Sequence, residues 1–110
     1  MALSAGDVVL VPFPYRDRLA EKTRPAVIVS SSAYNQKGDL VIAALTSQSP
    51  RFATDYALAD WKAAGLIAPS TARMLLATVA AARVQLHIGT LSDRDWSEVQ
   101  ARVLAVFAWP

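Results

Sequence analysis

The chain has no cysteine and only one histidine, His87. Disulfide bonds, thiolate metal sites and cysteine nucleophiles are therefore excluded, and one imidazole cannot supply a His-x-x-x-His metal pair or two catalytic histidines. The sequence also has no glycine-rich phosphate loop, no spaced metal ligands and no convincing serine–histidine–aspartate set. We therefore expect a protein that uses neither a metal nor another cofactor.

Long apolar segments are absent as well. No apolar run approaches the about 18–20 residues that span a membrane. The opening MALSAGDVVL lacks the basic region and long apolar stretch of a signal peptide. We expect no contact with a membrane and a cytoplasmic location.

The composition indicates one folded domain over residues 1–110. Hydrophobic residues make up 54% of the chain and charged residues 18%, which excludes a disordered or charge-solvated protein. This apolar excess suggests that part of the surface is buried against another chain. The net charge of +2 permits nucleic-acid binding without requiring it, so any basic surface must come from local clustering.

Short β-branched segments bounded by proline, glycine or polar turns predict a series of strands. They cover 7–13, 24–31 and 40–46, with a weaker strand at 52–58. Residues 71–78 fit a strand or a helix, and the neighbouring strands favour a strand. The charged segment 14–23 is expected to be an exposed loop. Because the strands are consecutive, we expect a mainly β fold, a small partly open barrel with a C-terminal α-helix.

The C-terminal helix has the clearest local signals. Ser92 is a favourable N-cap, and acidic residues follow it in the first turn. Trp96, Val99 and Val103 recur at helical spacing and predict one apolar face. We expect a helix from Ser92 to about Ala105, with Trp96 in the core.

Two polar residues stand at strand ends that can meet at one rim of the barrel. Arg24 opens the second predicted strand and Thr46 closes the third. A guanidinium donates two hydrogen bonds to phosphate oxygens and keeps its charge, and RNA carries its own nucleophile in the 2′-OH. Such a pair could promote RNA cleavage by stabilising charge on a phosphorane. From these residues alone, solvation of the rim by Arg24 is the competing interpretation.

Five blocks of the sequence carry a family resemblance. They are GDVVLVPFPYRD, KTRPAVIVSSSAYN, DLVIAALTSQ, LIAPSTARM and IGTLSDRDWSEVQARVLAVF, which extend from Gly6 to Phe107. In this order and spacing they resemble the MazF/PemK family of toxin endoribonucleases. The resemblance implies a homodimer of SH3-like barrels that cleaves single-stranded RNA at short sequences without a metal. It also implies 2′,3′-cyclic phosphate and 5′-hydroxyl products, and a small antitoxin protein as partner.

The resemblance further assigns roles to residues. Arg24 matches the family's catalytic arginine, which stabilises the phosphorane, and Thr46 matches a threonine that hydrogen-bonds the phosphate. The remaining candidates are expected to bind RNA: Arg16, Asp17, Arg18 and Lys22 in or beside the first loop, Ser47 and Gln48 after the third strand, and Ser70 and Arg73 after Pro69.

The sequence departs from the family between Met74 and Val84, where MLLATVAAARV is more apolar and richer in alanine than the charged stretch expected there. This suggests a tighter subunit interface or a different groove.

Two alternative functions stay open: a toxin of the same fold that acts on DNA gyrase, and a non-catalytic SH3-like binding module. His87 is expected to be exposed or capping rather than catalytic. Trp61 either stacks on a base or anchors a turn.

Overall fold

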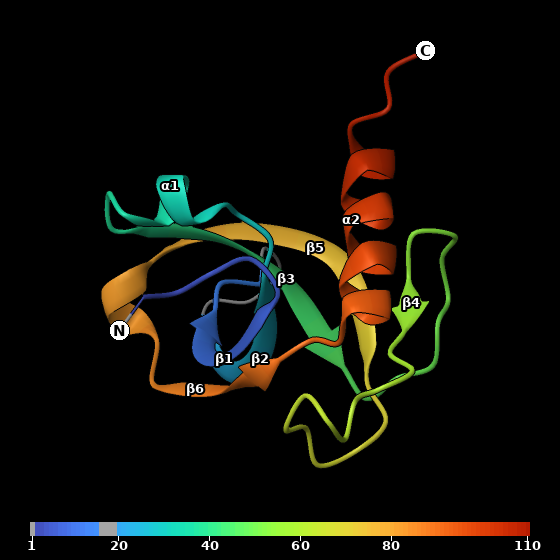
Figure 1. Ribbon diagram of the computed structural model, residues 1–110, viewed down its shortest axis with the longest axis horizontal. Coiled ribbons are helices and arrows are strands. Elements are labelled where there is room, and N and C mark those ends of the chain that lie inside the picture. Colours follow the sequence, from blue (N-terminus) through green and yellow to red (C-terminus); the bar gives the residue numbers. More distant parts are fainter. Residues whose placement is uncertain (1, 16–19) are drawn as a thin grey trace.

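The computed structural model describes residues 2–15 and 20–110, which form a curled antiparallel sheet with helices beside it (Figure 1). The strands are β1 (Asp7–Phe13), β2 (Lys22–Ile28), β3 (Asp39–Thr46), β4 (Tyr56–Ala57), β5 (Thr71–Ala80) and β6 (Leu86–Thr90). The helices are α1 (Ser32–Asn35), the 3-10 turn η1 (Ala81–Arg83) and α2 (Asp93–Val106). The strand order β4-β5-β3-β2-β1-β6 and the curl confirm the predicted mainly β, SH3-like partly open barrel.

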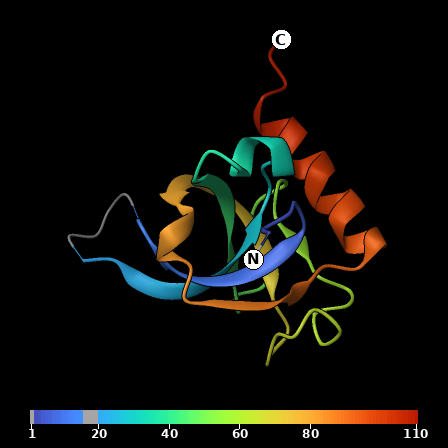
Figure 2. The same ribbon diagram turned by 60° about the vertical axis from the view of Figure 1, so that its left-hand side comes forward.

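The central strands bury both of their faces. Val8 and Val27 belong to one apolar cluster, whereas their neighbours Val9 and Ala26 belong to a second one, and all four are fully buried. This alternation follows from the two-residue period of a strand. Helix α2 stands along one side of the curled sheet, next to β4 and β5 (Figures 1 and 2), and adds the fully buried Val99 to the first cluster. The continuous apolar runs in the sequence are therefore strands with no solvent face.

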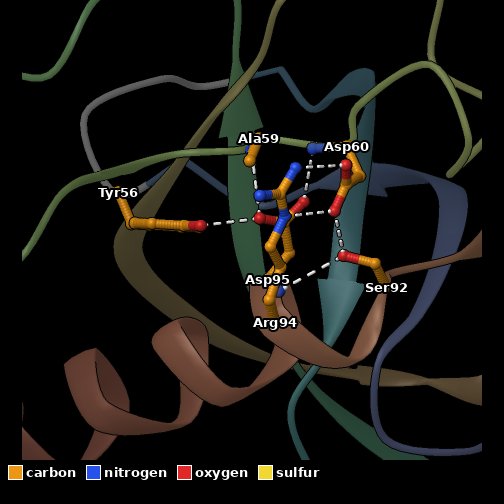
Figure 3. A network of polar contacts seen from close by, with 6 residues as sticks. All are labelled: Tyr56, Ala59, Asp60, Ser92, Arg94 and Asp95. Atoms are coloured by element: carbon orange, nitrogen blue, oxygen red, sulfur yellow. Dashed lines mark hydrogen bonds and ion pairs between the residues drawn. The ribbon is translucent and has the colours of Figure 1, made fainter.

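A buried carboxylate anchors the start of α2 (Figure 3). Asp95 is 0% exposed and accepts hydrogen bonds from the Tyr56 hydroxyl at 2.6 Å and from the backbone N–H groups of Ala59 and Asp60 at 3.0 and 2.8 Å. The N-cap Ser92 accepts from the Asp95 N–H at 3.3 Å and donates its own proton to the Asp60 carboxylate at 2.6 Å. The helix is thereby tied to β4 and to the loop that follows it.

The Tyr56 hydroxyl gives this network a signature at high pH. Burial and the hydrogen bond to the Asp95 carboxylate raise the pKa of Tyr56 from 10.0 to about 12. A raised pKa in the folded state stabilises the protein fully below pH 10, and this contribution is lost as the pH rises towards 12. We therefore expect the stability advantage of the wild type over Tyr56→Phe to shrink between these two values. Chemical denaturation across this range, with tyrosinate absorbance as a second readout, checks it; Tyr56 titrating at its ordinary pKa would contradict it.

The elements with strong local signals lie where the sequence predicts them. Strand β1 matches residues 7–13, and β3 begins one residue before the predicted 40–46. The ambiguous segment 71–78 is a strand, β5, which continues to Ala80. Helix α2 begins directly after the N-cap Ser92 and ends one residue beyond the predicted boundary.

Two predicted strands have different bounds. The weak strand at 52–58 shrinks to Tyr56–Ala57, because the Asp55 carboxylate accepts hydrogen bonds from the N–H groups of Arg51 and Phe52 and folds that stretch into a turn. Strand β2 runs from Lys22 to Ile28 instead of 24–31, and a short helix, α1, follows it. Serine starts this helix as a cap: the Ser31 hydroxyl accepts from the Tyr34 N–H at 3.2 Å.

The sequence analysis missed β6 entirely. Gly89 lies inside this strand, which pairs with β1 on the side away from β2. A Cβ atom on Gly89 would lie 2.2 Å from the carbonyl oxygen of Ala64. Glycine is required here because a loop backbone packs directly against the strand.

Candidate functional site

A pocket of about 610 Å³ opens where β2, β3 and β5 meet. Six of the ten residues that the sequence suggests for the site line it: Arg24, Thr46, Ser47, Gln48, Ser70 and Arg73. The guanidinium of residue 24 and the hydroxyl of residue 46 therefore share one cavity, as the sequence analysis expects.

The strand register explains why these residues meet. In the antiparallel β2–β3 pair, Ala26 lies opposite Ala44. Arg24 and Thr46 each lie two residues beyond this pair, at the same end of the two strands. On the other side of β3, Ala44 lies opposite Arg73 of β5. Since residues two apart share a face of a strand, the antiparallel pairing brings one arginine to each side of the end of β3.

Arg24 is a cation of the pocket that has no acidic partner among the residues that the structure describes. Its side chain is half-buried in the pocket wall, and none of the five ion pairs in this part of the chain includes it. A guanidinium presented to a cavity without a carboxylate is suited to bind an anion from solution.

The two hydroxyl groups of the pocket have complementary hydrogen-bonding capacity. The Thr46 hydroxyl accepts a hydrogen bond from the Gln48 N–H at 3.2 Å, which leaves its proton available to donate to a phosphate oxygen. The Ser70 hydroxyl donates to the Ala68 carbonyl at 2.9 Å, which leaves its oxygen lone pairs to accept. The Thr46 hydroxyl can therefore still donate a hydrogen bond into the pocket, whereas the Ser70 hydroxyl can still accept one.

Arg73 differs from Arg24 because it is held by a buried carboxylate. Its Nη2 lies 3.1 Å from Asp55, whose side chain is 1% exposed, and its Nη1 donates to the Gln48 side-chain oxygen at 3.0 Å. Burial by itself raises the pKa of Asp55, but hydrogen bonds from Arg73 and from the N–H groups of Arg51 and Phe52 outweigh it and lower the pKa below 3.8. Asp55 is therefore ionised at neutral pH, and it fixes the orientation of the Arg73 guanidinium.

The other suggested RNA-binding residues lie elsewhere. Lys22 is exposed at the start of β2 and does not line the pocket. Arg16, Asp17 and Arg18 lie outside the described residues.

Several apolar residues of the pocket were not anticipated from the sequence. Tyr15, Leu66, Ile67 and Leu75 all line it, and Ile67 is 99% exposed. Leu75 belongs to the apolar stretch that departs from the family pattern, which was the available signal. The pocket therefore combines cationic and hydroxyl groups with apolar walls, a surface that suits a phosphate next to aromatic bases.

Two residues weighed as functional have structural contacts instead. The His87 Nε2 lies 3.4 Å from the Asp7 carboxylate, and His87 does not line the pocket. Trp61 packs against the first apolar cluster, and its carbonyl accepts from the Leu66 N–H at 3.2 Å, which is a turn-anchoring contact.

Two kinds of feature are missing from residues 2–15 and 20–110. No three histidine, cysteine, aspartate or glutamate side chains gather there as metal ligands. No helix in this part of the chain is long and apolar enough to cross a membrane.

The curled sheet defines a small half-barrel protein with a pocket lined by two arginines and by serine and threonine hydroxyl groups. A model of the family described as "PemK-like, MazF-like toxin of type II toxin-antitoxin system" matches residues 4–107. The chain therefore belongs to the PemK/MazF toxin family.

Solved structures share the fold at low sequence identity. An endoribonuclease from a Mycobacterial species, in complex with its cognate antitoxin, has a TM-score of 0.78 and 18% identity and covers 99% of this chain and 100% of its own. MazF from Deinococcus radiodurans has a TM-score of 0.79 and 17% identity, covering 97% of each chain. Mycobacterium tuberculosis toxin MazF-mt6 has a TM-score of 0.76 and 17% identity, covering 94% of this chain and 99% of its own. No curated protein matches the sequence.

Proposed function

We propose that the chain is a sequence-specific, metal-independent endoribonuclease toxin that cleaves single-stranded RNA. The observation that carries the proposal is the shared pocket of Arg24 and Thr46, in which the cation has no acidic partner among the described residues and the hydroxyl has a proton to donate. This chemistry suits a phosphodiester. Membership of a toxin family of type II toxin–antitoxin systems supports the same activity.

In the proposed reaction the RNA supplies the nucleophile. The 2′-oxygen attacks the adjacent phosphorus and loses its proton, and the bond to the 5′-oxygen breaks as that oxygen takes up a proton. The products are a 2′,3′-cyclic phosphate and a 5′-hydroxyl. Arg24 stabilises the negative charge that builds up on the phosphorane oxygens, and Thr46 donates a hydrogen bond to one of them.

Cleavage of a purified RNA tests this proposal. The protein should cut single-stranded RNA in the presence of EDTA, and sequencing the 5′ ends should reveal a short common sequence. The fragments should carry 5′-hydroxyl groups. A substrate with a single 2′-deoxynucleotide at the cut should resist, since it has no nucleophile; cleavage of that substrate would contradict the mechanism.

The proposed partners follow from the same assignment. A cognate antitoxin is proposed because relatives have been solved in complex with theirs. A second copy of the chain is proposed because Leu104, Phe107 and Trp109 at the end of α2 are 71%, 51% and 83% exposed. We also propose a cytoplasmic location, and RNA contacts from Arg16, Asp17, Arg18 and Lys22.

We expect Thr46→Ala to lower the cleavage rate by about 2- to 10-fold, because a neutral hydrogen bond contributes about 0.5–1.5 kcal/mol. Thr46→Ser keeps the hydroxyl and should stay near the wild-type rate. Thr78→Ala is the matched control, since Thr78 lies on β5 but not in the pocket. Single-turnover cleavage of one RNA measures all three, and equal rates for Thr46→Ala and Thr78→Ala would remove Thr46 from the mechanism.

A further inference from the structure

An exposed aromatic ring lies beside the pocket and is not among the residues that line it. Phe52, in the loop between β3 and β4, is 59% exposed. The guanidinium carbons of Arg51 and Arg73 lie 5.5 and 5.6 Å from the centre of its ring. Arg73 also lines the pocket, so the ring and the phosphate site share a neighbour.

One buried carboxylate holds this arrangement together. Asp55 accepts from the N–H groups of Arg51 and Phe52 at 2.8 and 3.2 Å, and from the Arg73 Nη2 and Nε at 3.1 and 3.4 Å. It therefore fixes both the backbone that carries the ring and the guanidinium next to it. The Asp55 charge is buried with its hydrogen bonds satisfied, and these bonds fix the exposed Phe52 and the Arg73 side chain, which is 13% exposed.

We propose that Phe52 and Arg73 form a subsite for one nucleobase of the RNA, next to the phosphate site, and that Asp55 is the positioning residue for both. Bases of single-stranded RNA stack on aromatic rings and on guanidinium planes. A ring flanked by a fixed guanidinium offers one stacking surface and hydrogen-bond donors at its edge. The subsite rests on the proposed RNA cleavage and adds a base contact to it.

The variant Phe52→Leu tests the stacking contact. We expect its KM for a mapped substrate oligonucleotide to rise about 5- to 150-fold, the range that corresponds to loss of stacking on one base, with little change in kcat. Phe52→Trp should restore the KM because it keeps an aromatic face. Tyr34→Leu is the matched control, since Tyr34 also carries a cation over its ring, Lys37 at 4.3 Å, but lies on α1, far from β4 (Figure 1).

Substrates with a single abasic nucleotide identify the base that is contacted. At one position next to the cut, removal of the base should weaken binding to the wild type but leave the Phe52→Leu variant unaffected. Asp55→Asn should behave like Phe52→Leu, so that removal of that base no longer weakens its binding. A purely structural defect would instead weaken the binding of intact and abasic RNA equally. A KM unchanged in Phe52→Leu, or equal losses at every position, would overturn the subsite while leaving RNA cleavage in place. A wild type that neither binds nor cleaves single-stranded RNA would overturn both proposals.

Discussion

Arg24→Ala is expected to cleave a purified RNA about 10²- to 10³-fold more slowly than the wild type, the usual loss when one charge-stabilising donor is removed. The guanidinium lines the pocket and pairs with no carboxylate among the described residues, so its removal breaks no ion pair seen there. We therefore expect the far-UV circular dichroism and the molecular mass in solution to stay unchanged. Single-turnover cleavage of one substrate measures the effect.

Arg102→Ala is the matched control for this experiment. Arg102 pairs with Glu98 on α2 and does not line the pocket, so its loss should leave cleavage near the wild-type rate. A nearly normal rate for Arg24→Ala would refute the proposed role. Growth arrest in bacteria without RNA cleavage would favour the gyrase-directed alternative. The absence of both growth arrest and RNA cleavage would favour a binding module.

Asp95→Ala is expected to lower the free energy of unfolding by about 2–4 kcal/mol, because buried donors left without an acceptor cost about 1–3 kcal/mol each and partly regain water. The substitution removes the acceptor of the Tyr56 hydroxyl and of the N–H groups of Ala59 and Asp60 (Figure 3). The start of α2 would then lose its attachment to β4. Urea denaturation followed by circular dichroism measures the change.

Asp93→Ala provides the comparison for Asp95. Both residues lie in the first turn of α2, but Asp93 is exposed. Its loss removes only a favourable interaction with the helix dipole, worth about 0.3–1 kcal/mol. If the two variants lost similar stability, the buried network would contribute nothing beyond the charge of the helix terminus.

The candidate site could be predicted from the sequence only in part. Arg24 and Thr46 were found because polar residues at strand ends are visible in the pattern, and the family resemblance assigned them one site. Asp55 and Phe52 were missed because their roles depend on Arg73, which is 18 residues further along the chain than Asp55. No local pattern marks a carboxylate whose partner lies on another strand.

The fold, like the site, could be predicted from the sequence only where the signals are local. Strands β1 and β3 and helix α2 follow from β-branched runs, helical periodicity and an N-cap, which act within a few residues. Strand β6 carries no such signal, since its burial is partial and its glycine is explained only by the Ala64 carbonyl that packs against it.

The sequence by itself determined the mainly β class, the C-terminal helix and the absence of cysteine and paired-histidine chemistry, because these depend on composition and on short-range periodicity. Only the tertiary structure decided that Arg24, Thr46 and Arg73 line one pocket, that Asp55 holds one of the two arginines, and that Asp95 fastens the helix to β4. Those contacts depend on the register between strands and on the burial of charged groups. Both arise only when segments distant in the chain pack together and exclude water.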